Sequence, residues 1–242
     1  MTVRPFRVAL SAGFRKPDGS MTYPSFDLSP LTAASGIETR FLSHEDPIRA
    51  HELEDIDALI LLSERFTKNS IPASGKLSVV ARFGVGYDTV DLEACTQNDI
   101  AVCITPDGVR RPVAVSILTL MLALTGKLLI KDRITWQGPD GFAARNEHMG
   151  LGLVGRTLGS VGIGNIGTEM FRLAAPLGMK FIAHDPFADL SLAMELGVDL
   201  VDLDTVFAQS DVISINCPLT PDTHHLVNTS RLSQMKPTAY LI

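Results

Sequence analysis

The chain has 242 residues, of which 45% are apolar and 20% are charged, and its formal net charge is −6. This length admits one large domain or two small ones, and the composition is that of a soluble globular protein. The acidic balance argues against a nucleic-acid partner, because phosphates require a basic face. The three cysteines form no CxxC pair, so we expect no zinc or other metal and a reducing, cytoplasmic location. We read no signal peptide at the N-terminus.

The first half of the chain alternates short apolar runs with polar segments. The apolar runs predict strands at 6–12, 39–42, 58–62, 77–83 and 100–105. Short helices are expected at 48–53 and 91–97, the second with Asp91 as its N-cap. Continuous apolar strands between helices are typical of a parallel sheet that is covered on both faces, so this half predicts one α/β domain.

An apolar helix is predicted over residues 112–126, between the two halves of the chain. Its 15 apolar residues are fewer than the roughly 20 that a membrane span requires, so we expect a buried helix and no membrane contact. Residues 131–156 are polar and contain several glycines, which predicts a loop-rich arm or linker. A second α/β unit begins at Thr157, with strands expected at 157–163, 180–184, 198–201, 211–216 and 239–242.

A glycine motif, Gly162-x-Gly164-x-x-Gly167, follows the first strand of this second unit. A helix pattern opens behind it at 166–177, and the next strand ends in Asp185, 18 residues after Gly167. This spacing indicates a dinucleotide-binding Rossmann unit running from about Thr157 to Asp185.

Each residue of this motif has a physical role in such a unit. The first glycine permits a tight turn, the second lets the backbone approach a pyrophosphate, and the third lets the helix pack closely. The N–H groups of Asn165 and Ile166 lie where the helix dipole favours an anion. The carboxylate of Asp185 can accept hydrogen bonds from the adenosine ribose and would repel a 2′-phosphate, so the motif predicts NAD rather than NADP. The alternatives are a methyltransferase-type loop or a turn that binds nothing.

Together with the segments at 82–106, 211–228 and 231–242, this fingerprint resembles the D-2-hydroxyacid dehydrogenases, whose members include phosphoglycerate, glyoxylate/hydroxypyruvate and formate dehydrogenases. The resemblance implies a flavodoxin-like substrate domain over residues 1–110. The interdomain helix, the arm and an incomplete, doubly wound Rossmann NAD-binding domain would occupy residues 111–242.

The resemblance also assigns roles and partners. The loop of Gly84, Val85 and Gly86 would offer backbone N–H groups to a substrate carboxylate. Cys217 and Pro218 would line the cofactor, with Cys217 as a wall residue rather than a nucleophile. The implied reaction is hydride transfer between NAD(H) and a small 2-hydroxy or 2-keto acid, in a homodimer.

The catalytic arginine, glutamate and histidine of this family fall after the segment that ends at Ile242. None of the six histidines stands in a matching position, so we expect no catalytic residue within these 242 residues. Hydride transfer to a 2-keto acid needs a cation and a proton donor whose pKa lies near about 7. The sequence therefore leaves two hypotheses: a dehydrogenase whose catalytic groups lie further along the chain, or a non-catalytic NAD-binding protein. The second would be a corepressor-like sensor or a truncated product.

Overall fold

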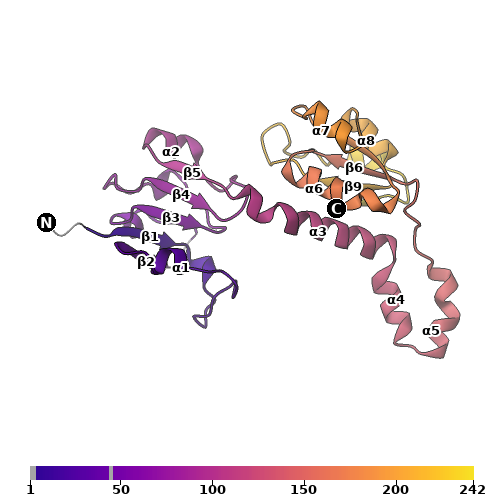
Figure 1. Ribbon diagram of the computed structural model, residues 1–242, viewed down its shortest axis with the longest axis horizontal. Coiled ribbons are helices and arrows are strands. Elements are labelled where there is room, and N and C mark those ends of the chain that lie inside the picture. The colour runs from indigo at the N-terminus through magenta and orange to yellow at the C-terminus, as the bar shows by residue number, and fades with distance from the viewer. Residues whose placement is uncertain (1–3, 44–45) are drawn as a thin grey trace. The chain divides into compact units, whose positions relative to one another are not determined.

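Two parallel β-sheets, each of five strands in the part of the chain described, organise the protein (Figure 1). The computed structural model describes residues 4–43 and 46–242. The chain divides into two compact units, Met1–Pro106 and Asp107–Ile242. Each unit contains one of the two sheets, which is the α/β architecture that the sequence predicts.

The first sheet has the flavodoxin-like strand order. Its strands are β1 (Phe6–Leu10), β2 (Ile37–Phe41), β3 (Ala58–Leu61), β4 (Val79–Arg82) and β5 (Ala101–Cys103). They lie in the order β2-β1-β3-β4-β5, and every pairing is parallel. This order places a topological switch point between β1 and β3, where ligands of such sheets bind beyond the carboxyl ends of the strands.

The connections of the first unit are short. The predicted helix at 91–97 is α2 (Leu92–Gln97), and Asp91 caps it by accepting a hydrogen bond from the Ala94 N–H at 2.9 Å. The helix expected at 48–53 is a single 3₁₀ turn, η2 (Ala50–Leu53). Three further short elements complete the unit: η1 (Ala12–Phe14), α1 (Ser29–Thr32) and η3 (Lys68–Ser70).

The second sheet has the order of a Rossmann sheet. Its strands are β6 (Thr157–Val161), β7 (Lys180–His184), β8 (Val198–Leu200), β9 (Val212–Ile215) and β10 (Tyr240–Leu241). They lie in the order β10-β9-β6-β7-β8, which corresponds to the 3-2-1-4-5 part of the Rossmann order. The helices are α6 (Asn165–Ala174), extended by the 3₁₀ turn η5 (Ala175–Leu177), α7 (Leu190–Glu195), α8 (Leu203–Gln209) and α9 (Thr229–Gln234).

The long apolar helix differs from its prediction in length and in burial. Helix α3 runs over Pro106–Thr125, so it has 20 residues and is long and apolar enough to cross a membrane by length and composition alone. Only 22% of the most apolar 18-residue stretch of this helix is buried. Ala114, Ile117 and Met121 are buried and pack in the core that also contains residues of α6. The expectation of a buried helix is therefore wrong for most of its circumference, because its apolar residues surround the helix while only one stripe faces the sheet.

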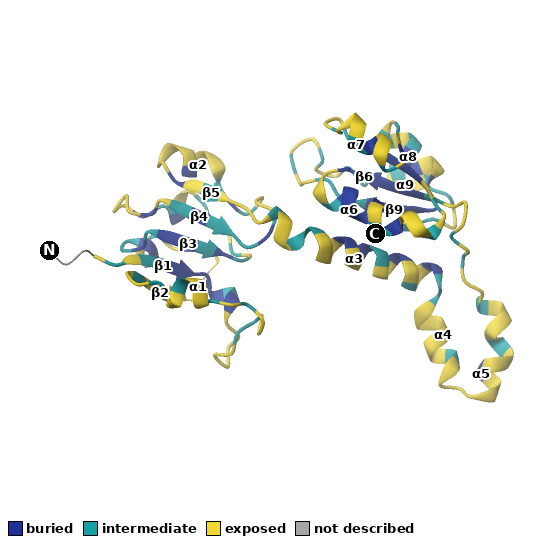
Figure 2. Cartoon of the chain, in the orientation of Figure 1, coloured by how far each residue is buried: buried dark blue, intermediate teal, exposed yellow. Residues whose placement is uncertain are grey.

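The segment predicted to be loop-rich is largely helical. It contains α4 (Leu128–Thr135), α5 (Pro139–Ala143) and the 3₁₀ turn η4 (Ala144–His148). The glycine pattern gave the wrong expectation for residues 131–148, where Gly138, with φ +65°, is the N-cap of α5 and Gly141 lies within this helix. Residues 149–156, which contain the other glycines of the segment, have no helix, as the sequence predicts. Helices α4 and α5 project away from the second sheet and are mostly exposed (Figures 1 and 2).

Candidate functional site

The glycine loop after β6 is folded as the motif requires. Gly162 has φ +97°, and a Cβ at this position would lie 2.9 Å from the carbonyl carbon of Asn216. A Cβ on Gly167 would lie 2.5 Å from the Gly162 oxygen. The first and third glycines are therefore required because other backbone segments lie too close to leave room for a side chain. No described atom lies within 4 Å of the corresponding position on Gly164, so the space in front of this glycine is open to a ligand.

The N-terminus of α6 faces this open space. Gly164 is the N-cap, and no side chain caps the helix. Among the described residues, the N–H groups of Asn165 and Ile166 have no hydrogen-bond acceptor. The Thr168 hydroxyl donates to the Ile163 carbonyl at 2.9 Å and fastens the loop to the helix. Free N–H groups at the positive end of a helix dipole form a binding site for a phosphate group.

Asp185 lies directly after β7, and its carboxylate is held in place by two backbone groups. One oxygen accepts the Ile163 N–H at 2.9 Å, and the other accepts the Phe187 N–H at 2.9 Å. The first bond fixes the carboxylate beside the glycine loop, although 22 residues separate the two in sequence. A fixed, half-buried carboxylate at this position is suited to accepting hydrogen bonds from ribose hydroxyls.

Cys217 and Pro218 follow β9, at the same edge of the sheet. Burial raises the pKa of the Cys217 thiol, and the negative charge of Asp185 raises it further. The thiol therefore stays protonated at neutral pH, which fits a wall residue rather than a nucleophile. The predicted cofactor residues thus come together at the ends of β6, β7 and β9, around the switch point between β6 and β9.

Two polar side chains behind the glycine loop were missed by the sequence reasoning. The Ser160 hydroxyl donates to the Gly162 carbonyl at 2.6 Å, and the Asn216 amide donates to Ser160 Oγ at 2.9 Å. Ser160 lies within β6 and Asn216 directly follows β9, and a polar residue at each of these positions is the signal that could have indicated them. They connect the carboxyl ends of β6 and β9.

Arg111 pairs with Glu169 at 2.6 Å, and this ion pair connects α3 to α6 within the second unit. The Glu169 side chain is only 9% exposed, so loss of Arg111 would leave a buried carboxylate without a cationic partner.

The predicted substrate loop of the first unit follows β4. Gly84 has φ +145°, and its carbonyl accepts the Thr105 N–H at 2.9 Å. Within the described part of the chain, the N–H groups of Val85 and Gly86 have no acceptor. They are therefore available to an acceptor such as a carboxylate. The guanidinium of Arg82, which the sequence reasoning did not single out, packs against Gly84 and donates to the Phe83 carbonyl.

The histidines and the other possible metal ligands of the described residues lie apart from this site or are dispersed. Over residues 4–43 and 46–242, no three His, Cys, Asp or Glu side chains gather as metal ligands. His184 contacts the Val201 carbonyl through Nδ1 at 3.1 Å, and the rings of His224 and His225 lie 3.9 Å apart on an exposed loop. His44 lies outside the described residues.

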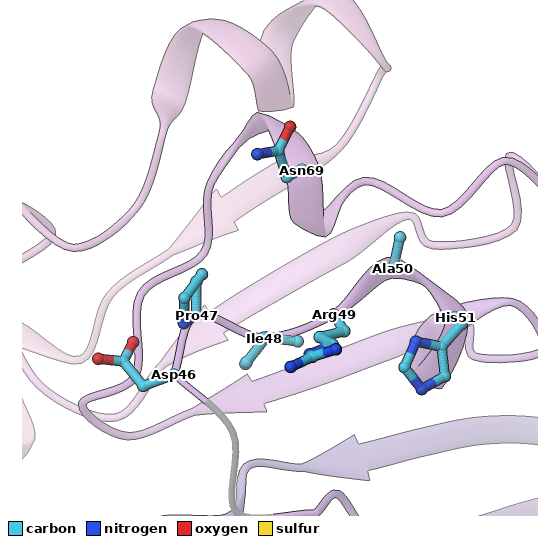
Figure 3. A pocket seen from close by; sticks show the side chains of 7 residues that line it. All are labelled: Asp46, Pro47, Ile48, Arg49, Ala50, His51 and Asn69. Carbon is cyan, nitrogen blue, oxygen red and sulfur yellow. The ribbon is translucent and has the colours of Figure 1, made fainter.

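A separate hollow in the first unit, shown in Figure 3, contains none of the predicted site residues. Its lining residues are Asp46, Pro47, Ile48, Arg49, Ala50, His51 and Asn69. The acid at its edge is already paired, because Asp46 accepts a hydrogen bond from Arg65 Nε at 3.2 Å.

Comparison with protein families gives two adjoining matches that cover most of the chain. Residues 29–117 match the D-isomer specific 2-hydroxyacid dehydrogenase catalytic domain, and residues 118–242 match the NAD-binding domain of the same family. These matches confirm the resemblance that the sequence motifs indicate, and they confirm NAD as the cofactor of the second unit.

Curated relatives are longer than this chain. The D-3-phosphoglycerate dehydrogenase of Synechocystis is 35% identical over 193 residues, which are 78% of this chain and 34% of the relative. The glyoxylate reductase of Thermococcus onnurineus is 33% identical over 196 residues, which are 79% of this chain and 59% of the relative. The match therefore spans between one third and three fifths of these proteins.

Solved structures agree in fold over nearly the whole chain. The D-lactate dehydrogenase of Aquifex aeolicus, complexed with NAD and lactic acid, is 25% identical with a TM-score of 0.80, covering 97% of this chain and 67% of that one. The NAD-dependent formate dehydrogenase of Staphylococcus aureus, in complex with NAD, has the same identity and TM-score and covers 98% and 72%.

Proposed function

The chain belongs to the D-isomer specific 2-hydroxyacid dehydrogenase family, and we propose that it transfers hydride between NAD(H) and a small 2-hydroxy or 2-keto acid. The observation that carries this proposal is the geometry at Asp185. Its carboxylate is fixed 2.9 Å from the Ile163 N–H, beside a glycine loop whose Gly164 faces open space. This arrangement fits the adenosine half of NAD, and bound NAD would supply the hydride acceptor or donor.

Each predicted residue has a defined part in this proposal. The N–H groups of Asn165 and Ile166 bind the pyrophosphate, and Asp185 binds the ribose. The N–H groups of Val85 and Gly86 hold the substrate carboxylate. In this family, the catalytic arginine, glutamate and histidine come after the segment that residues 231–242 resemble. We propose that these three residues have the same place in this protein.

The test is the reduction of 2-keto acids by NADH, followed through the absorbance of the reduced nicotinamide, with the protein as its source produces it. We expect NADH to bind and at least one 2-keto acid to be reduced. Binding of NADH without turnover on a broad panel of 2-keto acids would contradict the dehydrogenase proposal. It would favour a non-catalytic NAD-binding protein that responds to the cofactor.

For the partner, we propose a homodimer in which a second copy covers the apolar surface of α3 and α4. Leu120, Leu129 and Trp136 are 52%, 72% and 85% exposed, which is unusual for residues of this size in a water-facing helix pair. We expect sedimentation analysis to give a dimer mass. A Trp136→Ser, Leu129→Ser double variant should shift the mass towards the monomer, whereas an unchanged mass would contradict this surface assignment.

For the location, we propose the cytoplasm, with α3 as part of the second unit rather than a membrane span. The Arg111–Glu169 ion pair and the buried residues Ala114, Ile117 and Met121 attach α3 to the Rossmann unit. Cell fractionation with alkaline extraction tests this assignment. Recovery in the extracted membrane pellet would overturn it.

A further inference from the structure

Four aromatic side chains gather at the carboxyl end of the first sheet. The Phe83 ring contacts Phe14, Tyr23 and Phe26 with centroid distances of 5.4, 5.8 and 5.0 Å, and Phe14 stacks on Phe26 at 5.1 Å. Phe14 is fully buried, whereas Tyr23 is 42% exposed. We call this set the aromatic cluster. It runs from the core, at Phe14, to the surface, at Tyr23.

The segment between β1 and α1 holds these rings in place. It folds into η1 followed by an antiparallel bridge between Arg15 and Met21. The Thr22 hydroxyl donates to the Gly13 carbonyl at 2.7 Å, and the Thr22 N–H donates to the Phe14 carbonyl at 2.9 Å. Tyr23 is therefore attached to the end of β1 through its neighbour, and its ring is positioned in advance of any ligand.

The aromatic cluster adjoins the proposed carboxylate loop. Phe83 immediately precedes Gly84, and its N–H donates to the Leu61 carbonyl at 2.8 Å, which fixes it at the end of β4. Consecutive Cα atoms are about 3.8 Å apart, so the free N–H of Val85 lies within roughly 8 Å of the Phe83 Cα. The cluster therefore lies within reach of the substituent of an acid whose carboxylate binds at Val85 and Gly86.

Glu64 places one negative charge on the β1 side of the aromatic cluster, whereas the Arg82 guanidinium lies beside Gly84. Glu64 accepts the Gly13 N–H at 2.7 Å, next to Phe14 in sequence. Burial alone would raise the pKa of Glu64, but hydrogen bonds from Ser11 and from the Gly13 backbone bring it below its usual value. The carboxylate is therefore ionised at neutral pH and disfavours a second acidic group on a ligand placed there.

We propose that the exposed edge of the aromatic cluster, formed by Tyr23 and Phe83, receives the substituent of the substrate, so that the protein selects 2-keto acids with an aromatic or bulky apolar side chain. This inference rests on the proposed function, because it takes the Gly84–Gly86 loop as the carboxylate site. Aromatic rings favour contact with other rings in stacked or edge-on geometry, and neither glyoxylate nor a dicarboxylic acid provides such a contact.

The experiment compares phenylpyruvate with glyoxylate and 2-oxobutanedioate, using the protein as its source produces it with NADH present. Binding is measured by the rise in Tm at increasing acid concentration, and turnover by NADH oxidation. We expect phenylpyruvate to bind most tightly. Tyr23→Ala should weaken phenylpyruvate binding by about 3- to 10-fold and leave glyoxylate binding unchanged within about twofold.

Two further variants separate specificity from folding. Tyr23→Phe keeps the ring and should restore phenylpyruvate binding. Phe6→Ala removes a ring of similar exposure, 44%, from the beginning of β1. This variant should change the binding of neither phenylpyruvate nor glyoxylate. Equal binding of the three acids, or equal losses for phenylpyruvate and glyoxylate in Tyr23→Ala, would overturn the inference. Selective binding without turnover of any acid would overturn the proposed function and leave the selectivity standing.

Discussion

Removal of the Asp185 charge should change which nicotinamide cofactor the protein binds. The variant is Asp185→Asn, which keeps the shape of the side chain and one of its two acceptor oxygens for the Ile163 and Phe187 N–H groups. In the wild type, we expect the fixed carboxylate to accept hydrogen bonds from the ribose of NADH. In NADPH, a 2′-phosphate would meet the same carboxylate.

The magnitude follows from charge and distance. One pair of like charges at about 4 Å and an effective dielectric of about 20 costs about 4 kcal/mol, which is an upper bound for a half-buried group. Screening at physiological salt reduces this to roughly 1–2 kcal/mol. Hydrogen bonds to a charged acceptor contribute about 1.5–3 kcal/mol more. The sum corresponds to a preference for NADH of about 100-fold or more.

The assay is a fluorescence titration of NADH and of NADPH, which gives a Kd for each cofactor. We expect the wild type to favour NADH by about 100-fold and Asp185→Asn to bring the two Kd values within about 10-fold. The control is Asp199→Ser, which removes an exposed acid from the neighbouring strand β8 and should leave the ratio unchanged. A wild type that binds NADPH as tightly as NADH, or a variant with the wild-type ratio, would refute the role given to Asp185.

Four further predictions concern stability and cofactor binding. Gly167→Ala should lower the free energy of unfolding by about 1–3 kcal/mol in urea titrations, because its methyl would lie 2.5 Å from a backbone oxygen. Gly164→Ala, which meets no described atom within 4 Å, should weaken NADH binding and spare stability. Arg111→Met should cost more stability than Arg111→Met combined with Glu169→Gln, because the single change leaves a buried carboxylate unpaired; equal losses would argue against the pair. Although burial raises the pKa of Asp211, hydrogen bonds and nearby cations lower it overall, so its contribution is complete above the unfolded pKa of about 3.9 and declines as pH falls through the lower folded value. Asp211→Asn should therefore flatten the loss of stability measured below about pH 4, and an unchanged pH profile would contradict this account.

The strands and the cofactor motif were accessible from sequence because their signals are local. A strand of a parallel sheet is buried on both faces, so it appears as a short apolar run whatever its neighbours are. All ten observed strands overlap the predicted ones within the described residues. The spacing of Gly162, Gly164, Gly167 and Asp185 likewise places a turn, a helix start and the tip of the next strand within one unit of the chain.

The helical segments were harder to predict from the sequence. The apolar residues of α3 predict burial, but burial depends on which surfaces other segments cover, and only the stripe through Ala114, Ile117 and Met121 meets the core. Similarly, the glycines after Lys131 suggested loops, yet Gly138 is the N-cap of α5 and Gly141 lies within this helix.

By itself, the sequence determined the α/β class, the strands, the NAD-binding motif and the family, since each depends on residues close together in the chain. Only the tertiary structure decided the strand orders, the bond from Ile163 to Asp185 across 22 residues, and the support of Gly162 by Ser160 and Asn216. It also brought Tyr23 and Phe26 from the first loop to Phe83, before the substrate loop. These features arise from contacts between distant segments, whose energies depend on complementary packing and are not encoded in the periodicity of any one segment.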